Sequence, residues 1–299
     1  MTALWVAAAL IASAAQTARN ATQASLTRAI GTVGATQVRF LFGLPFALLF
    51  LLLVRSFGGE AIPALTPRAL GFTTLGALAQ IGATALMLLT MKQRSFAVTT
   101  AWIKTEPVLV ALIAALVLGD PLTWTALLAI AIATAGVLLM SVKPGSGLAM
   151  WREAGPALTG LLAGALFGAS AIGFRGGITS LETGGFLIRA TTTLAVSLVL
   201  QTAILLVWLA LFDRAALRAS FGVWRSSLGA GFLGAFASQF WFIGFSLTSA
   251  ANIRTLALVE VIFAQAVSRF VFRQAVSKRQ LLGMTVIMLG VGLLLRNQT

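Results

Sequence analysis

The chain has 299 residues, of which 59% are hydrophobic and only 9% are charged. Soluble domains carry about 25% charged residues, so this composition indicates a membrane protein. The sequence contains no cysteine, histidine or tyrosine and only seven acidic residues, which excludes disulfides, thiol and histidine chemistry and the commonest metal sites.

The net charge of +14 could point to a nucleic-acid partner. The lysine and arginine residues, however, stand singly between apolar runs and do not form one basic stripe. This pattern is typical of the loops and helix ends of a membrane protein. We therefore expect membrane lipid and a small molecule as partners, and no nucleic acid.

Apolar runs separated by glycine, proline and charge predict an all-α integral membrane protein with about ten transmembrane helices, each near the ~20 residues that a bilayer requires. The first run resembles a signal peptide but lacks a basic start, so we interpret it as a retained helix. The predicted helices are 4–18, 32–54, 69–91, 95–118, 122–142, 156–174, 184–211, 227–248, 250–272 and 280–295.

A polar segment in the middle of the chain divides these helices into two sets of five. We expect a first repeat at 1–145, a connecting loop at 146–155 and a second repeat at 156–299. A shift of 154 residues supports the duplication, because it places Glu106 over Glu260 and Gly136 over Gly290. Since each half has an odd number of spans, the halves should be inverted relative to each other, as in many secondary transporters.

Three motifs carry a family resemblance: "VRF" at 38–40, "TEPVLVALIAALVLGDPLT" at 105–123 and "ALVEVIFAQAVSRFVF" at 257–272. Over essentially the whole chain, the sequence resembles the ten-helix EamA branch of the drug/metabolite transporter superfamily. Within that branch it is most similar to bacterial amino-acid exporters of the YddG type. The turn at 273–280 departs from the family pattern, because it lacks the acidic residue that the first half keeps as Asp120.

The resemblance implies a multi-pass protein of the bacterial inner membrane that exports a small molecule by alternating access without a cofactor. It also implies that both termini lie in the cytoplasm. The distribution of lysine and arginine disagrees, since the odd-numbered loops hold most of them and the positive-inside rule would place those loops in the cytoplasm. We adopt the orientation that the resemblance implies.

Two charges lie inside the predicted helix at 95–118, Lys104 and Glu106. A charge at bilayer depth costs at least about 2.5 kcal/mol, so each should have a partner or a function. They stand two residues apart and point about 200° away from each other on a helix, so they cannot pair with one another. Pro107 follows directly and should kink the helix just before it.

Helix rise predicts partners for the two glutamates. Glu106 lies about 15 Å and Arg39 about 10 Å from the same membrane face, which an arginine side chain can bridge. The repeat then predicts a second pair, Arg189 with Glu260. These pairs could only tie helices together, or one member could meet a substrate charge or a proton; both interpretations stay open. Lys104 could be a ligand or could extend its charge to the interface.

A cavity with apolar walls and a few polar groups is also expected, with lipid contact or core packing as the alternative for its aromatic residues. Trp102 and Glu106 are four apart and should share its face. The candidate substrate-binding residues are Trp102, Glu106, Arg39, Gln80, Thr84, Gln239 and Trp241, joined by Phe240 and Phe245, whereas Lys104, Arg189 and Glu260 are candidate structural or coupling charges. "GLLAGALFG" at 160–168 predicts a close helix-packing face.

Export of amino acids or related metabolites is the leading functional hypothesis. Export of cationic or hydrophobic drugs is the alternative within the same superfamily. A membrane enzyme or scaffold is the alternative from another class, but without histidine or cysteine little catalytic chemistry remains, so we expect no enzyme. A proton-driven exporter would have to use Glu106 or Glu260.

Overall fold

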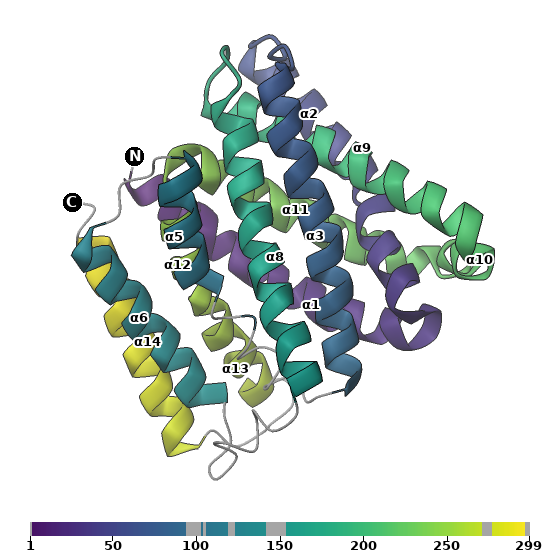
Figure 1. Ribbon diagram of the computed structural model, residues 1–299. Helices are drawn as coiled ribbons and strands as arrows, with labels where there is room; N and C mark the ends of the chain where they lie inside the picture. The colour runs from purple at the N-terminus through teal and green to yellow at the C-terminus, as the bar shows by residue number, and fades with distance from the viewer. Residues whose placement is uncertain are drawn as a thin grey trace. The chain divides into compact units, whose positions relative to one another are not determined.

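The computed structural model describes residues 2–93, 103, 106–118, 123–141, 154–270 and 277–296, which form helices and short connections without any strand (Figure 1). The helices are α1 (Thr2–Leu41), α2 (Leu44–Gly58), α3 (Pro67–Gln93), α5 (Glu106–Leu118), α6 (Trp124–Ser141), α8 (Ala154–Thr179), α9 (Phe186–Phe212), α10 (Arg214–Gly222), α11 (Trp224–Leu247), α12 (Ala250–Leu256), a 3-10 turn (Ala257–Val259), α13 (Glu260–Phe270) and α14 (Lys278–Arg296).

Several of these helices are long and apolar enough to cross a bilayer. Within the described residues they are Ile30–Gly58, Pro67–Thr90, Leu158–Thr179, Phe186–Phe212 and Trp224–Leu247, and a shorter apolar helix covers Trp124–Leu139. They agree with predicted spans to within a few residues. The all-helical membrane fold is therefore confirmed.

Four segments differ from the predicted boundaries. The first predicted helix does not end at 18, because α1 continues to Leu41 and only Gly31 leaves helical geometry, with a φ of 74°. The second predicted span is interrupted between α1 and α2, where Pro45 stands in the first turn of α2. The predicted span at 250–272 is divided by the 3-10 turn, and the polar connection after α9 contains α10.

The chain divides into two compact units. The first contains Ala3–Ile81 and Gly173–Thr248, and the second contains Gly82–Ile172 and Ser249–Thr299. Each unit takes helices from both halves of the sequence. The compact units therefore do not coincide with the predicted repeats.

In the first unit, α9 packs against α2 and α11, and α10 packs against α9 and α11. The interior contains many polar side chains, since α9 buries a run of threonines at 191–193 together with Ser197, Gln201 and Thr202. Aromatic contacts fill the space between helices: the rings of Phe46 and Phe232 lie edge to face with their centroids 5.2 Å apart.

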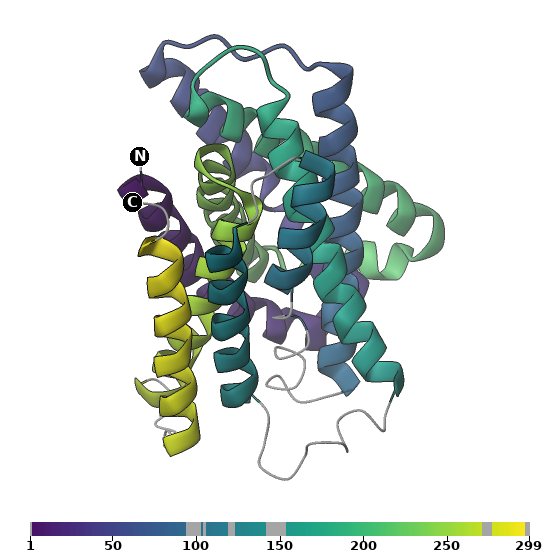
Figure 2. The same cartoon turned by 60° about the vertical axis from the view of Figure 1, so that its left-hand side comes forward.

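In the second unit, α6 and α14 run side by side, as Figures 1 and 2 show. A Cβ on Gly136 would lie 2.7 Å from the backbone nitrogen of Ile287, and a Cβ on Gly290 would lie 2.5 Å from that of Ala133. The residue numbers of the contacts increase along α6 while they decrease along α14, so the helices are antiparallel. Because the shift of 154 residues maps Gly136 onto Gly290 and Ala133 onto Ile287, the crossing has the symmetry expected of inverted repeats.

Candidate functional site

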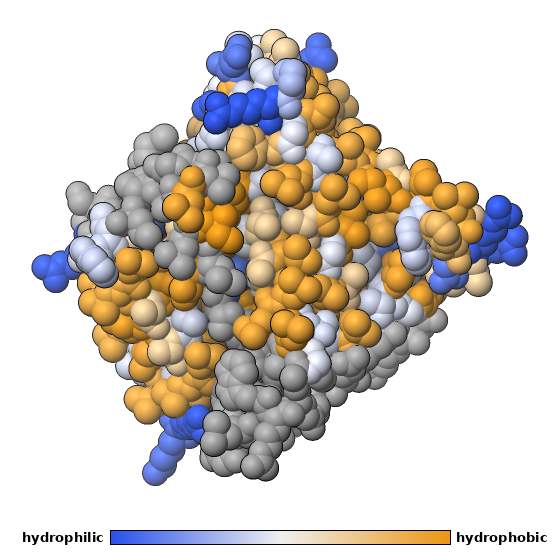
Figure 3. Space-filling view, in the orientation of Figure 1, coloured by the Kyte–Doolittle hydropathy of each residue, from blue (hydrophilic) through white to orange (hydrophobic). Residues whose placement is uncertain are grey.

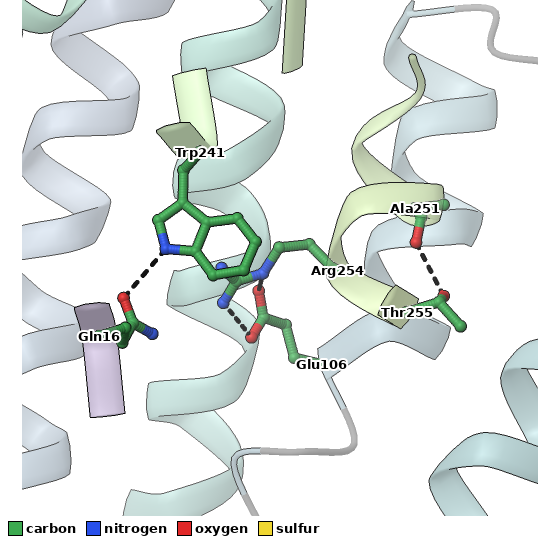
Figure 4. A network of polar contacts seen from close by, with 6 residues as sticks. All are labelled: Gln16, Glu106, Trp241, Ala251, Arg254 and Thr255. Carbon is green, nitrogen blue, oxygen red and sulfur yellow. Dashed lines mark hydrogen bonds and ion pairs between the residues drawn. The ribbon is translucent and has the colours of Figure 1, made fainter. Parts of the chain in front are cut away.

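A bidentate ion pair lies inside the second unit. The Arg254 guanidinium donates from Nε to Oε1 of Glu106 at 2.5 Å and from Nη2 to Oε2 at 2.6 Å (Figure 4). Only 2% of the Glu106 side chain and 12% of the Arg254 side chain are exposed. Charge-assisted bonds to both carboxylate oxygens offset the cost of burying two ions, and they fix the orientation of the guanidinium plane.

The local sequence explains how each partner is placed. Glu106 is the first residue of α5, where the positive end of the helix dipole favours a carboxylate and where the missing N–H of Pro107 removes no helical bond. Arg254 lies on α12, which begins because the Ser249 hydroxyl accepts the backbone N–H of Asn252 at 3.2 Å. The kink predicted before Pro107 falls largely outside the described residues.

The glycines at 164 and 168 bring α8 against this region. A Cβ on Gly164 would lie 3.0 Å from the carbonyl oxygen of Ile103, and one on Gly168 would lie 3.0 Å from the side chain of Val110 and 3.7 Å from Cγ of Glu106. The close packing face predicted for "GLLAGALFG" is therefore confirmed at these two positions. It encloses the ion pair on one side.

Arg254 is the partner that sequence reasoning missed. The predicted helix at 250–272 includes this residue, although sequence reasoning treats its charge as one of the loop charges; the structure places it on α12. Ser249, a preferred N-cap residue five positions earlier, supports its place on a helix. The predicted pairs Arg39–Glu106 and Arg189–Glu260 each join residues of different units and stay predictions.

Arg19 is a second arginine that sequence reasoning assigned to a loop. It is only 3% exposed, because α1 continues through this position and carries it into the interior of the first unit. The side chains of Arg19 and Arg39 both approach Gly234 of α11, at 3.6 Å and 3.5 Å from where its Cβ would lie. The Arg39 guanidinium also lies 5.1 Å from the centroid of the Phe40 ring.

Three predicted cavity residues form hydrogen bonds within the first unit. Gln239 Nε2 donates to Thr191 Oγ1 at 2.8 Å. Trp241 Nε1 donates to Gln16 Oε1 at 3.1 Å, as Figure 4 shows. Gln80 Oε1 accepts from Gln201 Nε2 at 2.7 Å. Trp241 is 5% exposed, so this ring packs in the interior and does not contact lipid.

These contacts show which predicted residues lie together. Gln80 and Gln239 bond to residues ten positions apart on α9, which corresponds to about 15 Å of helix, and a cavity shared by the two stays a prediction. Gln239 and Trp241 contact different helices. Thr84 is buried in the second unit. Trp102 and Lys104 lie outside the described residues.

Among the described residues, no group of three or more His, Cys, Asp or Glu side chains could hold a metal ion. The polar groups of the site are instead a carboxylate, guanidinium groups, amides and hydroxyls. Such groups can bind and exchange charged or hydrogen-bonding parts of a solute.

Comparison with known proteins gives the family. The model of the EamA-like transporter family matches residues 3–142 and again residues 155–296. The chain belongs to the EamA-like transporter family. The family domain is thus present twice, and the Glu106–Arg254 pair joins the first copy to the second.

The fold is shared with solved structures. One titled "Crystal structure of protein" has a TM-score of 0.70, covers 98% of this chain and 96% of its own, and is 15% identical. At that identity the likeness shows the fold alone. No curated protein matches this sequence. The family makes this EamA protein a membrane transporter of the drug/metabolite superfamily and not an enzyme.

Proposed function

We propose that this EamA protein is a secondary transporter that exports amino acids or related small metabolites across the bacterial inner membrane by alternating access. Membership of the family supports transport. The proposed resemblance to amino-acid exporters of the YddG type and the cytoplasmic location of the termini belong to the same proposal.

The number of buried positive and negative side chains supports the proposed class of substrate. Within the described helices, Arg19, Arg39 and Arg254 are buried or nearly so, whereas the buried acidic residues are Glu106 and Glu260. A buried positive charge favours a solute that brings a negative one. A substrate with a carboxylate fits this balance better than a cationic drug does, since a cation would add to the excess.

The Glu106–Arg254 pair supports a mechanism in which the two family copies move relative to each other. A substrate carboxylate competes with Glu106 for the guanidinium, and the substrate ammonium group competes for Glu106. Binding of a zwitterion can therefore exchange contacts between the copies without leaving either charge unpaired. Arg39 and Trp102 stay predicted substrate contacts.

A transport assay tests the proposal. The purified chain is reconstituted in liposomes and given a panel of radiolabelled amino acids, a panel of cationic drugs and protein-free liposomes as the control. We expect saturable flux of amino acids, strongest for neutral and aromatic ones. Flux of the cations alone would contradict the proposed substrate class.

A further inference from the structure

The connection between α9 and α11 carries a surface that the transport mechanism does not use. Its basic members are Arg214, Arg218 and Arg225, all exposed. Its aromatic members are Phe212, Phe221 and Trp224, which are 71%, 52% and 49% exposed. We call these six residues the α10 surface. In Figure 3, hydrophilic atoms gather beside apolar ones at the right-hand edge, where Figure 1 shows α10.

The α10 helix is a fixed part of the first unit. Asp213 caps it by accepting the backbone N–H of Ala216 at 2.9 Å, and Ser220 is fully buried on the inner side. The Phe221 ring lies 6.4 Å from that of Phe42, which lies in the turn between α1 and α2. Ser220 thus marks the inner side of α10, whereas Arg214 and Arg218 on the same helix are exposed.

The three arginines differ in what they do for the fold. Arg214 Nε donates to the carbonyl oxygen of Ala210 at 2.8 Å, and the Arg225 guanidinium lies 5.5 Å from the Trp224 ring. Arg218 forms no hydrogen bond or ion pair with the described part of the chain. Asp213 is the acidic residue of this connection, and its carboxylate is engaged in the cap, so the α10 surface is positive.

The position of α10 between two long apolar helices indicates where it lies relative to the membrane. It joins Phe186–Phe212 to Trp224–Leu247, both long and apolar enough to cross the bilayer, and at nine residues it is too short to cross itself. It therefore lies at a membrane face. Exposed aromatic rings beside arginines are typical of segments that lie at the level of the lipid headgroups.

We propose that the α10 surface binds the headgroups of anionic phospholipids. The arginines donate to lipid phosphates, and the aromatic rings enter the adjoining apolar layer. A soluble anion explains the arginines but leaves the exposed rings unaccounted for, and the arginines are spread along a surface without converging on one pocket. The bilayer supplies both chemistries at the same depth.

The test uses the full chain in detergent micelles, to which phosphatidylglycerol or phosphatidylcholine is added while thermal unfolding is followed. The variant is Arg218→Gln with Arg225→Gln. The matched control is Arg55→Gln with Arg68→Gln, two exposed arginines elsewhere, of which Arg68 lies over the ring of Phe72 as Arg225 lies over Trp224.

We expect phosphatidylglycerol to stabilise the parent at lower concentration than phosphatidylcholine does. Each arginine lost should raise the concentration of phosphatidylglycerol required by about fivefold, hence roughly 25-fold for the variant. The control pair should leave it unchanged. Because Arg218 forms no hydrogen bond or ion pair with the described part of the chain, Arg218→Gln alone gives the same test if the double variant unfolds.

Three results would overturn the proposal: equal stabilisation of the parent by both lipids, an unchanged preference in the variant, or an equal loss in the control. Glycerol 3-phosphate separates the two sources of phosphate. If it stabilises the parent as well as phosphatidylglycerol does, the surface binds a soluble anion and not the membrane.

Discussion

At the scale of single residues, the fold depends on how buried charges are compensated. Glu106 lies in a helix region that would pay at least about 2.5 kcal/mol for an ion without a partner. Both of its oxygens accept bonds from Arg254, so neither ion is left uncompensated. The pair thus compensates the buried charge of Glu106. Because its members come from different family copies, it also links the copies.

The first prediction concerns this pair. Glu106→Gln should lower the free energy of unfolding by about 3–5 kcal/mol, because it leaves the buried Arg254 without its carboxylate. Adding Arg254→Gln should restore part of the loss. Thermal unfolding in detergent measures both, and Glu182→Gln, an exposed glutamate, is the control for the change in charge.

Additive losses in that double variant would contradict the coupling between Glu106 and Arg254. The same cycle with Arg39→Gln tests the pair predicted from sequence. Coupling with both arginines would mean that the Glu106 carboxylate is shared between them.

At the scale of helices, the sequence predicted where apolar segments lie but not where they break. The predicted span at 69–91 agrees with α3 because its hydropathy is continuous and its ends are polar. The division at Ala257–Val259 has no glycine or proline to mark it, so hydropathy alone could not reveal it. Arg19 falls in a predicted loop because its charge ends the first apolar run, whereas α1 continues through this position.

The candidate site was predictable only in part, and for a related reason. The depth of Glu106 follows from helix rise, and a buried charge there calls for a partner. The identity of the partner depends on which helices touch, which one sequence does not contain. Sequence reasoning looked within one half and predicted Arg39, whereas the structure shows Arg254 from the other half as a partner.

The second prediction belongs to the crossing of α6 and α14. Gly290→Ala should destabilise the protein by about 1–3 kcal/mol, because its Cβ would meet the backbone of Ala133, which cannot move aside as a side chain can. Gly292→Ala is the matched control on the same helix, with nothing within 4 Å of its Cβ, and should be neutral or stabilising. Equal melting temperatures for the two variants would refute the close crossing.

The third prediction concerns the whole molecule's orientation. The chain has no cysteine, so single cysteines can be introduced without background. If both termini are cytoplasmic, Arg218→Cys should react with a membrane-impermeant thiol reagent added outside the cell. Arg55→Cys lies near an even-numbered connection, which faces the opposite side of the membrane from the connection that holds Arg218. It should react only after permeabilisation. The reverse pattern would favour the orientation given by the positive-inside rule.

The last prediction concerns how transport is driven. With no histidine in the chain, a proton carried through the membrane region needs a carboxylate, and Glu106 and Glu260 are the buried ones within the described residues. Glu260 begins α13 at the position equivalent to Glu106, which begins α5, and we assign the proton to Glu260. Glu260→Gln should then abolish stimulation of amino-acid flux by a pH gradient.

The same variant should retain exchange of labelled for unlabelled amino acid across liposomes without a gradient, since exchange needs binding and movement but no net proton transfer. Glu182→Gln, exposed and outside the helices, should keep both activities. A parent protein whose flux ignores the gradient would make the mechanism facilitated diffusion or coupling to another ion. If the flux of the Glu260→Gln variant still responds to the pH gradient, another group carries the proton.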